Sequence, residues 1–188
     1  MAKINVGCGW ECRDGWLNVD NTQKWQKVNY PITFMDATVA WPYEDNKFTA
    51  ALSEHMIEHI PRASGRVFFK EMFRTLKPGK TARVTCPNRT FFETLRDNAH
   101  PFVVNYCKEI LNGAIPSAQR VRERTLNDQG HVWVPTPEQL VAAFEEAGFV
   151  DVKVVPYGES KHKVFDGIEE FNGIREHETL CVEGTKPK

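Results

Sequence analysis

The sequence has no apolar run long enough to cross a membrane and no excess of charge of either sign. Its 24 lysines and arginines nearly balance 25 aspartates and glutamates, which leaves a formal net charge of -1 at pH 7. A chain without an overall basic field is not drawn electrostatically to nucleic-acid phosphates or to anionic lipid. We therefore expect no membrane association, and nucleic acid is a poor candidate for a partner.

Cysteine is also scarce. The five cysteines are an odd number, and they are scattered without the paired spacing of a disulfide framework. The first residues lead directly into an apolar segment at Ile4, without the charged and apolar regions of a secretory signal peptide. Both features predict a cytoplasmic protein with reduced thiols.

The 188 residues, 41% of them hydrophobic, suit one domain with a substantial core. Apolar residues within 69–76 recur at helical spacing, and the Lys77-Pro78-Gly79 segment ends that helix. A second helix is predicted after Thr136, which is its N-cap, with Gln139 as capping-box partner and Gly148 as C-cap. Two short strands are predicted near the N-terminus, one at the start of residues 4–9 and one within residues 15–20. Further strands are predicted at residues 32–35, 48–53, 81–86, 150–155 and 178–183.

This alternation of strands and helices predicts an α/β fold with a doubly wound, mainly parallel sheet and helices on both faces. In such sheets, ligands bind beyond the carboxyl ends of the strands. Residues 89–134 interrupt the alternation, and we expect them to be irregular except for a helix around residues 103–111. The chain is therefore predicted to be one domain, residues 1–188, with residues 89–134 as an insertion that forms part of a substrate site.

The most informative motif couples a strand and glycine turn, residues 4–9, to a second strand that ends in Asp20. Gly7 and Gly9 let the backbone approach a ligand closely, and an aspartate in this place can accept both hydroxyls of a ribose. The pairing indicates a nucleoside site, although ordinary turns between strands are the alternative interpretation. Only ten residues separate Gly9 from Asp20, so we expect a shortened first crossover without a full helix.

Further motifs follow along the chain: Asp36-Ala37 ahead of Trp41-Pro42, then Ser53-Glu54-His55-Met56-Ile57-Glu58-His59, then Leu76-Lys77-Pro78-Gly79. In this order the motifs resemble those of the class I S-adenosylmethionine-dependent methyltransferases, specifically the small Methyltransf_11-like group. The resemblance covers nearly the whole chain. It implies a seven-stranded, Rossmann-like methyltransferase sheet.

The resemblance also implies a binding site for S-adenosylmethionine, with S-adenosylhomocysteine as the product. The glycine turn would receive the methionine part, and the two strand-end aspartates would bind the ribose hydroxyls and the adenine amino group. The segment after the fourth strand would line the face beneath the sulfonium. The residues that the resemblance assigns to the cofactor are Gly7, Cys8, Gly9, Asp20, Asp36, Ala37, Ser53, Glu54 and His55.

Methyl transfer from a sulfonium is a direct displacement, so the protein mainly has to align the reacting atoms in a dry site. His131 is the first candidate for a base or substrate contact, because imidazole titrates near neutral pH. His59 is the second, and a structural role is an equal alternative for each. The predicted function is methylation of an oxygen or nitrogen atom on a small molecule, with residues 89–134 and 156–176 shaping the acceptor site.

Two other functions stay open. His55 to His59 spells H-x-x-E-H, the inverted zinc-peptidase pattern, which needs a sustained helix and a third ligand. Pro61 follows too closely for such a helix, so no metal site is predicted and a zinc hydrolase is a remote alternative. A catalytically silent protein that binds S-adenosylmethionine or S-adenosylhomocysteine would share the same fold.

Overall fold

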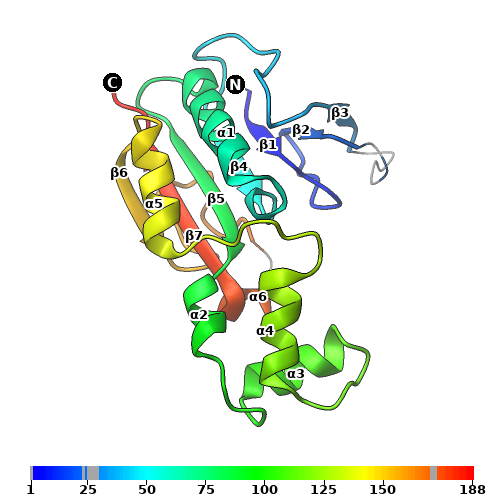
Figure 1. The fold of residues 1–188 in the computed structure, drawn as a ribbon. Coiled ribbons are helices and arrows are strands. Elements are labelled where there is room, and N and C mark those ends of the chain that lie inside the picture. The colour runs from blue at the N-terminus through cyan, green and yellow to red at the C-terminus, as the bar shows by residue number, and fades with distance from the viewer. Residues whose placement is uncertain (1, 23, 25–29, 170–172) are drawn as a thin grey trace.

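The computed structural model describes residues 2–22, 24, 30–169 and 173–188, and within them seven strands form one sheet in the order β3-β2-β1-β4-β5-β7-β6 (Figure 1). Strand β7 pairs antiparallel with both β5 and β6, and the other pairs are parallel. The predicted seven-stranded, mainly parallel α/β sheet is therefore confirmed. The strands are β1 (Ile4–Val6), β2 (Leu17–Asp20), β3 (Ile32–Phe34), β4 (Ala51–Glu54), β5 (Thr81–Pro87), β6 (Val150–Val155) and β7 (Thr179–Thr185).

Two long helices cover one face of the sheet (Figure 1). Phe69 of α1 and Phe144 of α5 are buried against the strands, with their ring centroids 5.0 Å apart. The other face is covered by the segment after β6, where Phe165 packs against Leu52 and lies 6.2 Å from the ring of Trp16. The helices are η1 (Ile57–His59, a 3-10 turn), α1 (Arg62–Thr75), α2 (Arg89–Thr94), α3 (Pro101–Glu109), α4 (Ala118–Asn127), α5 (Pro137–Glu146) and α6 (Arg175–Glu178).

The first crossover is as short as the sequence predicts, because turns rather than a helix join β1 to β2. The amides of Gly7 and Cys8 both donate to the carbonyl of Val19, at 2.8 and 3.1 Å. Between the strands themselves, the side-chain amide of Asn5 in β1 donates to Asn18 Oδ1 in β2 at 3.1 Å. These bonds hold the glycine turn against the end of β2, where it can present its backbone to a ligand.

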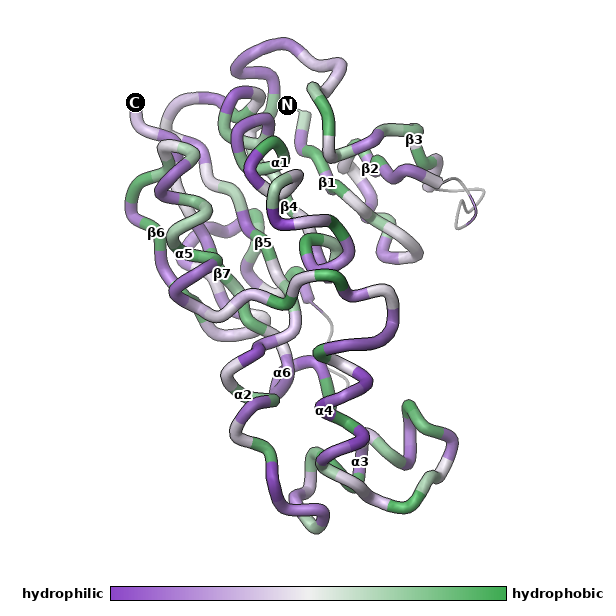
Figure 2. The backbone as a smooth tube through the Cα atoms, in the orientation of Figure 1, coloured by the Kyte–Doolittle hydropathy of each residue, from purple (hydrophilic) through white to green (hydrophobic). Residues whose placement is uncertain are grey.

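The prediction for residues 89–134 is wrong in one respect, since three helices form there instead of one. Helices α2, α3 and α4 lie beyond the carboxyl end of β5 and build a hydrophobic cluster of their own (Figure 1). Ser117 caps α4 by accepting from the amide of Arg120 at 3.2 Å. Only a narrow apolar stripe of α4 is buried, and Figure 2 shows that the helix is mostly hydrophilic along its length, so hydrophobic periodicity did not reveal it.

Two predicted element boundaries also need correction. The fourth strand begins at Ala51 rather than residue 48, because Phe48 makes only an isolated bridge with Leu76. The capping box of α5 is confirmed, but its C-cap is Ala147, and Gly148 follows with a φ of +104°. Among the described residues, the helices lack the length and apolar character of a transmembrane span.

Candidate functional site

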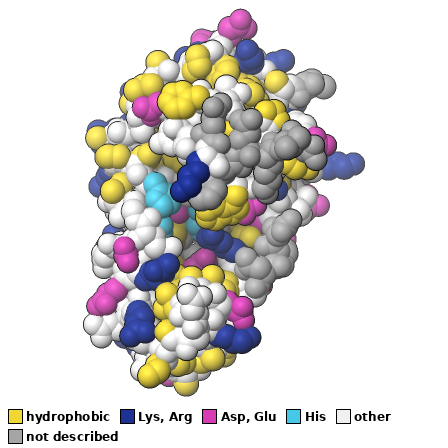
Figure 3. Space-filling view, turned by 90° about the vertical axis from the view of Figure 1, so that its right-hand side faces the viewer, with side chains coloured by type: hydrophobic (Ala, Val, Ile, Leu, Met, Phe, Trp, Pro, Cys, Tyr) yellow, Lys and Arg dark blue, Asp and Glu magenta, His cyan; other side chains and the backbone are white. Residues whose placement is uncertain are grey.

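A cavity of about 680 Å³ lies beyond the carboxyl ends of β1, β2 and β4. Its volume falls within the roughly 300–1,000 Å³ of small-molecule sites. The glycine turn and the strand ends form one side of the cavity, and α3, α4 and the loop after α4 form the other. Figure 3 shows histidine side chains at the surface in the hollow between the sheet and the helices of the insertion.

The cavity brings together most of the residues that the sequence assigns to the cofactor. Eight of the nine line it: Gly7, Cys8, Gly9, Asp20, Asp36, Ala37, Glu54 and His55. The exception is Ser53, which is completely buried and does not line the cavity. Side chains alternate along a strand, so Ser53 shares the face of β4 on which Ala51 enters the core. The two predicted catalytic histidines, His59 and His131, both line the cavity.

The glycine turn is built so that its backbone faces the cavity. Gly7 has a φ of +67°, and a Cβ at this position would lie 2.1 Å from Cγ of Met56. At Gly9 a Cβ would meet open space, and the Gly9 amide donates to Asp20 Oδ2 at 2.9 Å. Gly7 is therefore fixed by its packing, and Gly9 joins the turn to the carboxylate at the end of β2.

Two carboxylates stand at neighbouring strand ends. Asp20 Oδ1 accepts from the amide of Thr22 at 3.1 Å. Asp36 Oδ1 accepts from the amide and hydroxyl of Thr38 at 2.8 and 2.6 Å, and these bonds lower the pKa of Asp36. An ionised carboxylate is a strong acceptor for hydroxyl and amino groups. The pair therefore suits the ribose and the adenine amino group of a nucleoside.

An ion pair that sequence reasoning missed ties the crossover loop to β4. Arg13 Nε donates to Glu54 Oε2 at 3.0 Å, and Arg13 Nη1 donates to the carbonyl of Ile168 at 2.7 Å. Burial raises the pKa of Glu54, and the Arg13 guanidinium opposes that shift. Nothing in the local pattern around Arg13 indicates this contact, because Glu54 lies 41 residues away in the chain.

The nearest partners of the His55 ring lie outside the H-x-x-E-H pattern, although its Nδ1 also lies 3.3 Å from Glu58 Oε1. His55 has a φ of +47°, its Nε2 lies 3.1 Å from Thr179 Oγ1, and Arg175 Nη1 lies 2.9 Å from its Nδ1. Burial and the Arg175 guanidinium hold the pKa of His55 well below its usual value. Because η1 is a single 3-10 turn, His55 and His59 do not share the helix face that the zinc-peptidase pattern requires.

Three chemically active side chains meet where the insertion closes the cavity. The ring centroids of His59 and His131 are 4.8 Å apart, and the fully buried side chain of Glu58 lies beside them. Burial raises the pKa of Glu58 to about 7 and lowers that of His131. The carbonyl of Glu58 accepts from the amide of Val132 at 2.8 Å, which fixes the loop carrying His131 against η1.

The cavity also contains residues that were not predicted individually, although all but Glu178 fall in the ranges predicted to shape the acceptor site. They are Tyr106, Thr125 and Gln129 from the insertion, and Tyr157, Arg175 and Glu178 from the last third of the chain. Burial raises the pKa of Glu178 to about 7, against the influence of the Arg175 guanidinium 3.3 Å away. These groups reach the cavity because segments that are distant from one another in the sequence pack together around it. Residues 170–172, within the predicted acceptor segment 156–176, lie outside the described residues.

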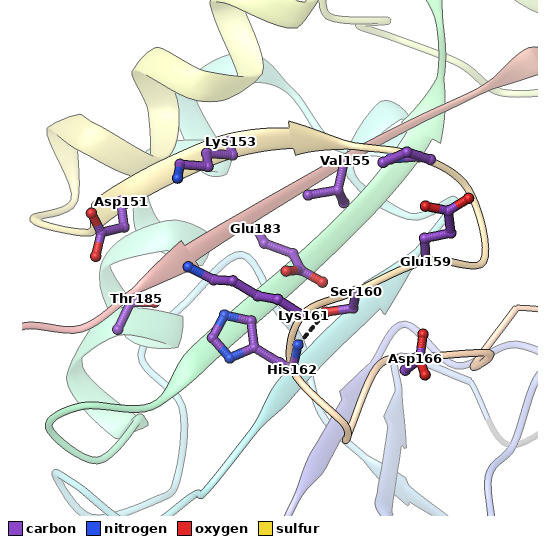
Figure 4. A pocket seen from close by; sticks show the side chains of 11 residues that line it. Asp151, Lys153, Val155, Glu159, Ser160, Lys161, His162, Asp166, Glu183 and Thr185 are labelled. Carbon is purple, nitrogen blue, oxygen red and sulfur yellow. Dashed lines mark hydrogen bonds between the residues drawn. The ribbon is translucent and has the colours of Figure 1, made fainter.

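A second cavity, of about 380 Å³, lies between β6 and the loop that follows it. Figure 4 shows Asp151 and Lys153 on β6, with Lys161 and His162 approaching from that loop. It is remote from the glycine turn and from the converging strand ends, which favours the first cavity as the functional site.

Comparison with known proteins identifies the family and the fold of the chain. A family model described as "Methyltransferase domain" matches residues 8–154. No protein of curated function matches the chain.

Solved structures with the same fold include an S-adenosylmethionine-dependent methyltransferase from Archaeoglobus fulgidus, at 15% identity and a TM-score of 0.61, covering 98% of this chain and 86% of that one. A possible histamine N-methyltransferase from Thermotoga maritima is 18% identical, with a TM-score of 0.62 and coverage of 98% and 82%. Phosphoethanolamine N-methyltransferase 2 from Haemonchus contortus, in complex with phosphomonomethylethanolamine and S-adenosylhomocysteine, is 16% identical, with a TM-score of 0.51 and coverage of 100% and 49%.

Proposed function

Because this chain belongs to the methyltransferase-domain family and is thereby an S-adenosylmethionine-dependent methyltransferase, we propose that it methylates an oxygen or nitrogen atom of a small molecule. The observation that carries the proposal is the single cavity that joins the glycine turn and strand-end carboxylates to His59 and His131. One side of this cavity fits the cofactor. The other side offers polar groups to an acceptor.

The residues present fit the cofactor in charge and in shape. Asp20 and Asp36 supply acceptors for the ribose and the adenine amino group, and the open space beside Gly9 leaves room for the methionine part. When bound, S-adenosylmethionine supplies a methyl group on a cationic sulfur, which keeps the electron pair of the carbon–sulfur bond when the acceptor attacks.

The size of the cavity supports a small acceptor. Its volume of about 680 Å³ lies in the range of small-molecule sites. The Haemonchus contortus relative was solved with phosphomonomethylethanolamine, which is also small. We propose that residues 89–134 form the acceptor side through Tyr106, Ile110 and Thr125.

In this proposal the protein aligns the acceptor and excludes water, and the two histidines act on the attacking atom. His131 Nδ1 lies 2.5 Å from the carbonyl of Thr125, a contact in which the ring nitrogen must donate. Its Nε2 then carries a lone pair that can receive a proton from a hydroxyl or amine. His59 is the second candidate for this role.

Removing either strand-end carboxylate is expected to weaken S-adenosylhomocysteine binding. Hydrogen bonds to charged groups contribute about 1.5–3 kcal/mol, so Asp20→Ala should raise Kd by roughly 10- to 100-fold and Asp36→Ala by a similar factor. Isothermal titration calorimetry measures both. Asp14→Ala is the matched control, because this exposed aspartate lies in the loop between β1 and β2 but does not line the cavity. Wild-type affinity in both cavity variants would show that the cofactor site is elsewhere.

A transfer assay separates an enzyme from a silent binder. We expect labelled methyl to pass from the cofactor into a metabolite pool, and His131→Ala to slow transfer by roughly 10²- to 10⁴-fold without loss of S-adenosylhomocysteine binding. His162→Ala, in the second cavity, should transfer at the wild-type rate. Cofactor binding by the wild type without transfer to any acceptor would favour the silent protein.

We also propose that the protein works in the cytoplasm. All five cysteines are free, and four of them are buried. Reduced thiols in a folded core are typical of a reducing compartment.

A further inference from the structure

Three side chains of types that bind metal ions meet at the proposed acceptor end of the cavity. One ligand atom each from Glu58, His59 and His131 lies within 4.8 Å of the other two. Glu58 and His59 are neighbours in η1, whereas His131 comes from the loop after α4. The amides of Val132 and Trp133 both donate to the carbonyl of Glu58, at 2.8 and 3.2 Å, so the two segments are fixed to each other beside the cluster.

Both imidazoles are oriented as metal ligands commonly are. His131 Nδ1 lies 2.5 Å from the carbonyl of Thr125, and His59 Nδ1 lies 3.3 Å from the carbonyl of Gly130. A carbonyl can only accept, so each Nδ1 carries the proton and each Nε2 presents a lone pair. A backbone carbonyl bound to the second ring nitrogen is the usual partner of a metal-ligating histidine, because it fixes the tautomer and the ring orientation.

The carboxylate of Glu58 is the strongest sign that the cluster has a ligand. Its side chain is 0% exposed, it lines the cavity, and neither oxygen has a hydrogen-bond partner among the described residues. His55 Nδ1 approaches Oε1 to 3.3 Å, but Arg175 Nη1 lies 2.9 Å from that same ring nitrogen. A buried carboxylate without partners is costly unless it is paired with a charge or coordinates a metal.

We propose that Glu58, His59 and His131 bind a divalent transition-metal ion of the zinc class. Two histidines and one glutamate are a ligand set of catalytic zinc, which leaves a coordination position open. All three residues line the cavity, so a cation held by them would be within reach of an acceptor in it. The site differs from the zinc-peptidase pattern, because His55 is held by Thr179 and Arg175 and His131 takes its place.

The role of the cation, though not its binding, rests on the proposed function. With its Nε2 bound to the cation, His131 would no longer receive the proton of the acceptor. The cation would instead polarise an acceptor hydroxyl and lower the pKa of its proton, which would pass to solvent, and the oxygen would then attack the methyl carbon while the sulfur keeps the electron pair of the carbon–sulfur bond. This favours an acceptor with a hydroxyl group. The sequence predicted no metal site, since nothing in the local pattern links His131 to residues 55–59.

Calorimetry with zinc chloride tests the site on the full chain, purified without a tag and freed of metal by a chelator. We expect one equivalent of Zn²⁺ to bind. Loss of an outer-shell partner typically costs 10–100-fold in metal affinity, so loss of a ligand in Glu58→Gln or His131→Ala should weaken binding by more than about 100-fold. Cobalt chloride as a second probe should give a visible absorption band that the same variants lose.

Matched controls separate this site from others. Glu178→Gln removes another buried carboxylate of the cavity, and His162→Ala removes a histidine of the second cavity. Cys12→Ser tests the thiols, because Cys12 Sγ and Cys8 Sγ lie 3.8 Å apart. All three controls should bind Zn²⁺ like the wild type.

The proposal is overturned if the wild type binds no stoichiometric Zn²⁺, or if binding survives in Glu58→Gln and His131→Ala. S-adenosylhomocysteine binding by each variant, measured in the same buffer, shows that the variant is folded. It also separates the two proposals: a wild type that binds Zn²⁺ but not S-adenosylhomocysteine would remove the proposed function and leave the metal site.

Discussion

Replacing Gly7 by alanine is expected to abolish S-adenosylhomocysteine binding, with a rise in Kd of at least about 100-fold. The new Cβ would lie 2.1 Å from Cγ and 2.7 Å from Cβ of Met56, at a φ of +67°. The left-handed conformation alone costs an alanine roughly 1–2 kcal/mol. The clash must then move the turn or the segment after β4, and both line the cavity. Titration calorimetry measures the loss.

Gly113→Ala is the matched control for this variant. Gly113 has a φ of +78°, but a Cβ there has nothing within 4 Å, and the residue does not line the cavity. It should carry the same conformational strain and bind S-adenosylhomocysteine like the wild type. If Gly7→Ala is folded by circular dichroism and binds within about threefold of the wild type, the glycine turn does not have the role assigned to it.

The second large effect concerns the buried ion pairs of Arg83, and we expect Arg83→Ala to lower the free energy of unfolding by about 3–5 kcal/mol. Arg83 is 0% exposed; its Nε lies 2.5 Å from Glu169 Oε1 and its Nη1 lies 2.8 Å from Glu183 Oε1. Truncation leaves both carboxylates buried without their counter-ion. Urea unfolding followed by circular dichroism measures the change.

Arg89→Ala is the control for this prediction. Arg89 and Glu93 form an exposed pair one helical turn apart, with side chains 43% and 48% exposed, and such pairs contribute only about 0.3–0.5 kcal/mol. A loss of less than about 1 kcal/mol in Arg83→Ala would contradict the account of this network. Because Glu169 also accepts from the amide of Gly158 at 3.1 Å, the variant should loosen the loop that carries Tyr157 to the cavity.

The residues of the proposed cofactor side could be placed together from sequence because they lie in short motifs at strand ends. A positive φ at Gly7 and a carboxylate at the end of a strand are properties of local segments, and parallel strands bring such ends together. Asp20 and Asp36 therefore appear on the cavity as expected. Ser53 does not, because its position in an alternating strand turns it into the core.

The proposed acceptor side of the cavity depends on contacts that no local pattern encodes. His59 meets His131 because the carbonyl of Glu58 binds the loop after α4.

Arg83 is buried in a strand whose residues are all buried, and its partners are 86 and 100 residues away. The sequence could indicate that β5 is a buried strand, but not that an arginine in it would find two glutamates.

Titration of the wild-type protein with S-adenosylhomocysteine tests the central claim most directly. The account predicts saturable binding of one equivalent, weakened roughly 10- to 100-fold in Asp20→Ala and unchanged in Asp14→Ala. Absence of binding by the folded wild type at millimolar ligand would contradict it, as would equal affinity in wild type and Asp20→Ala.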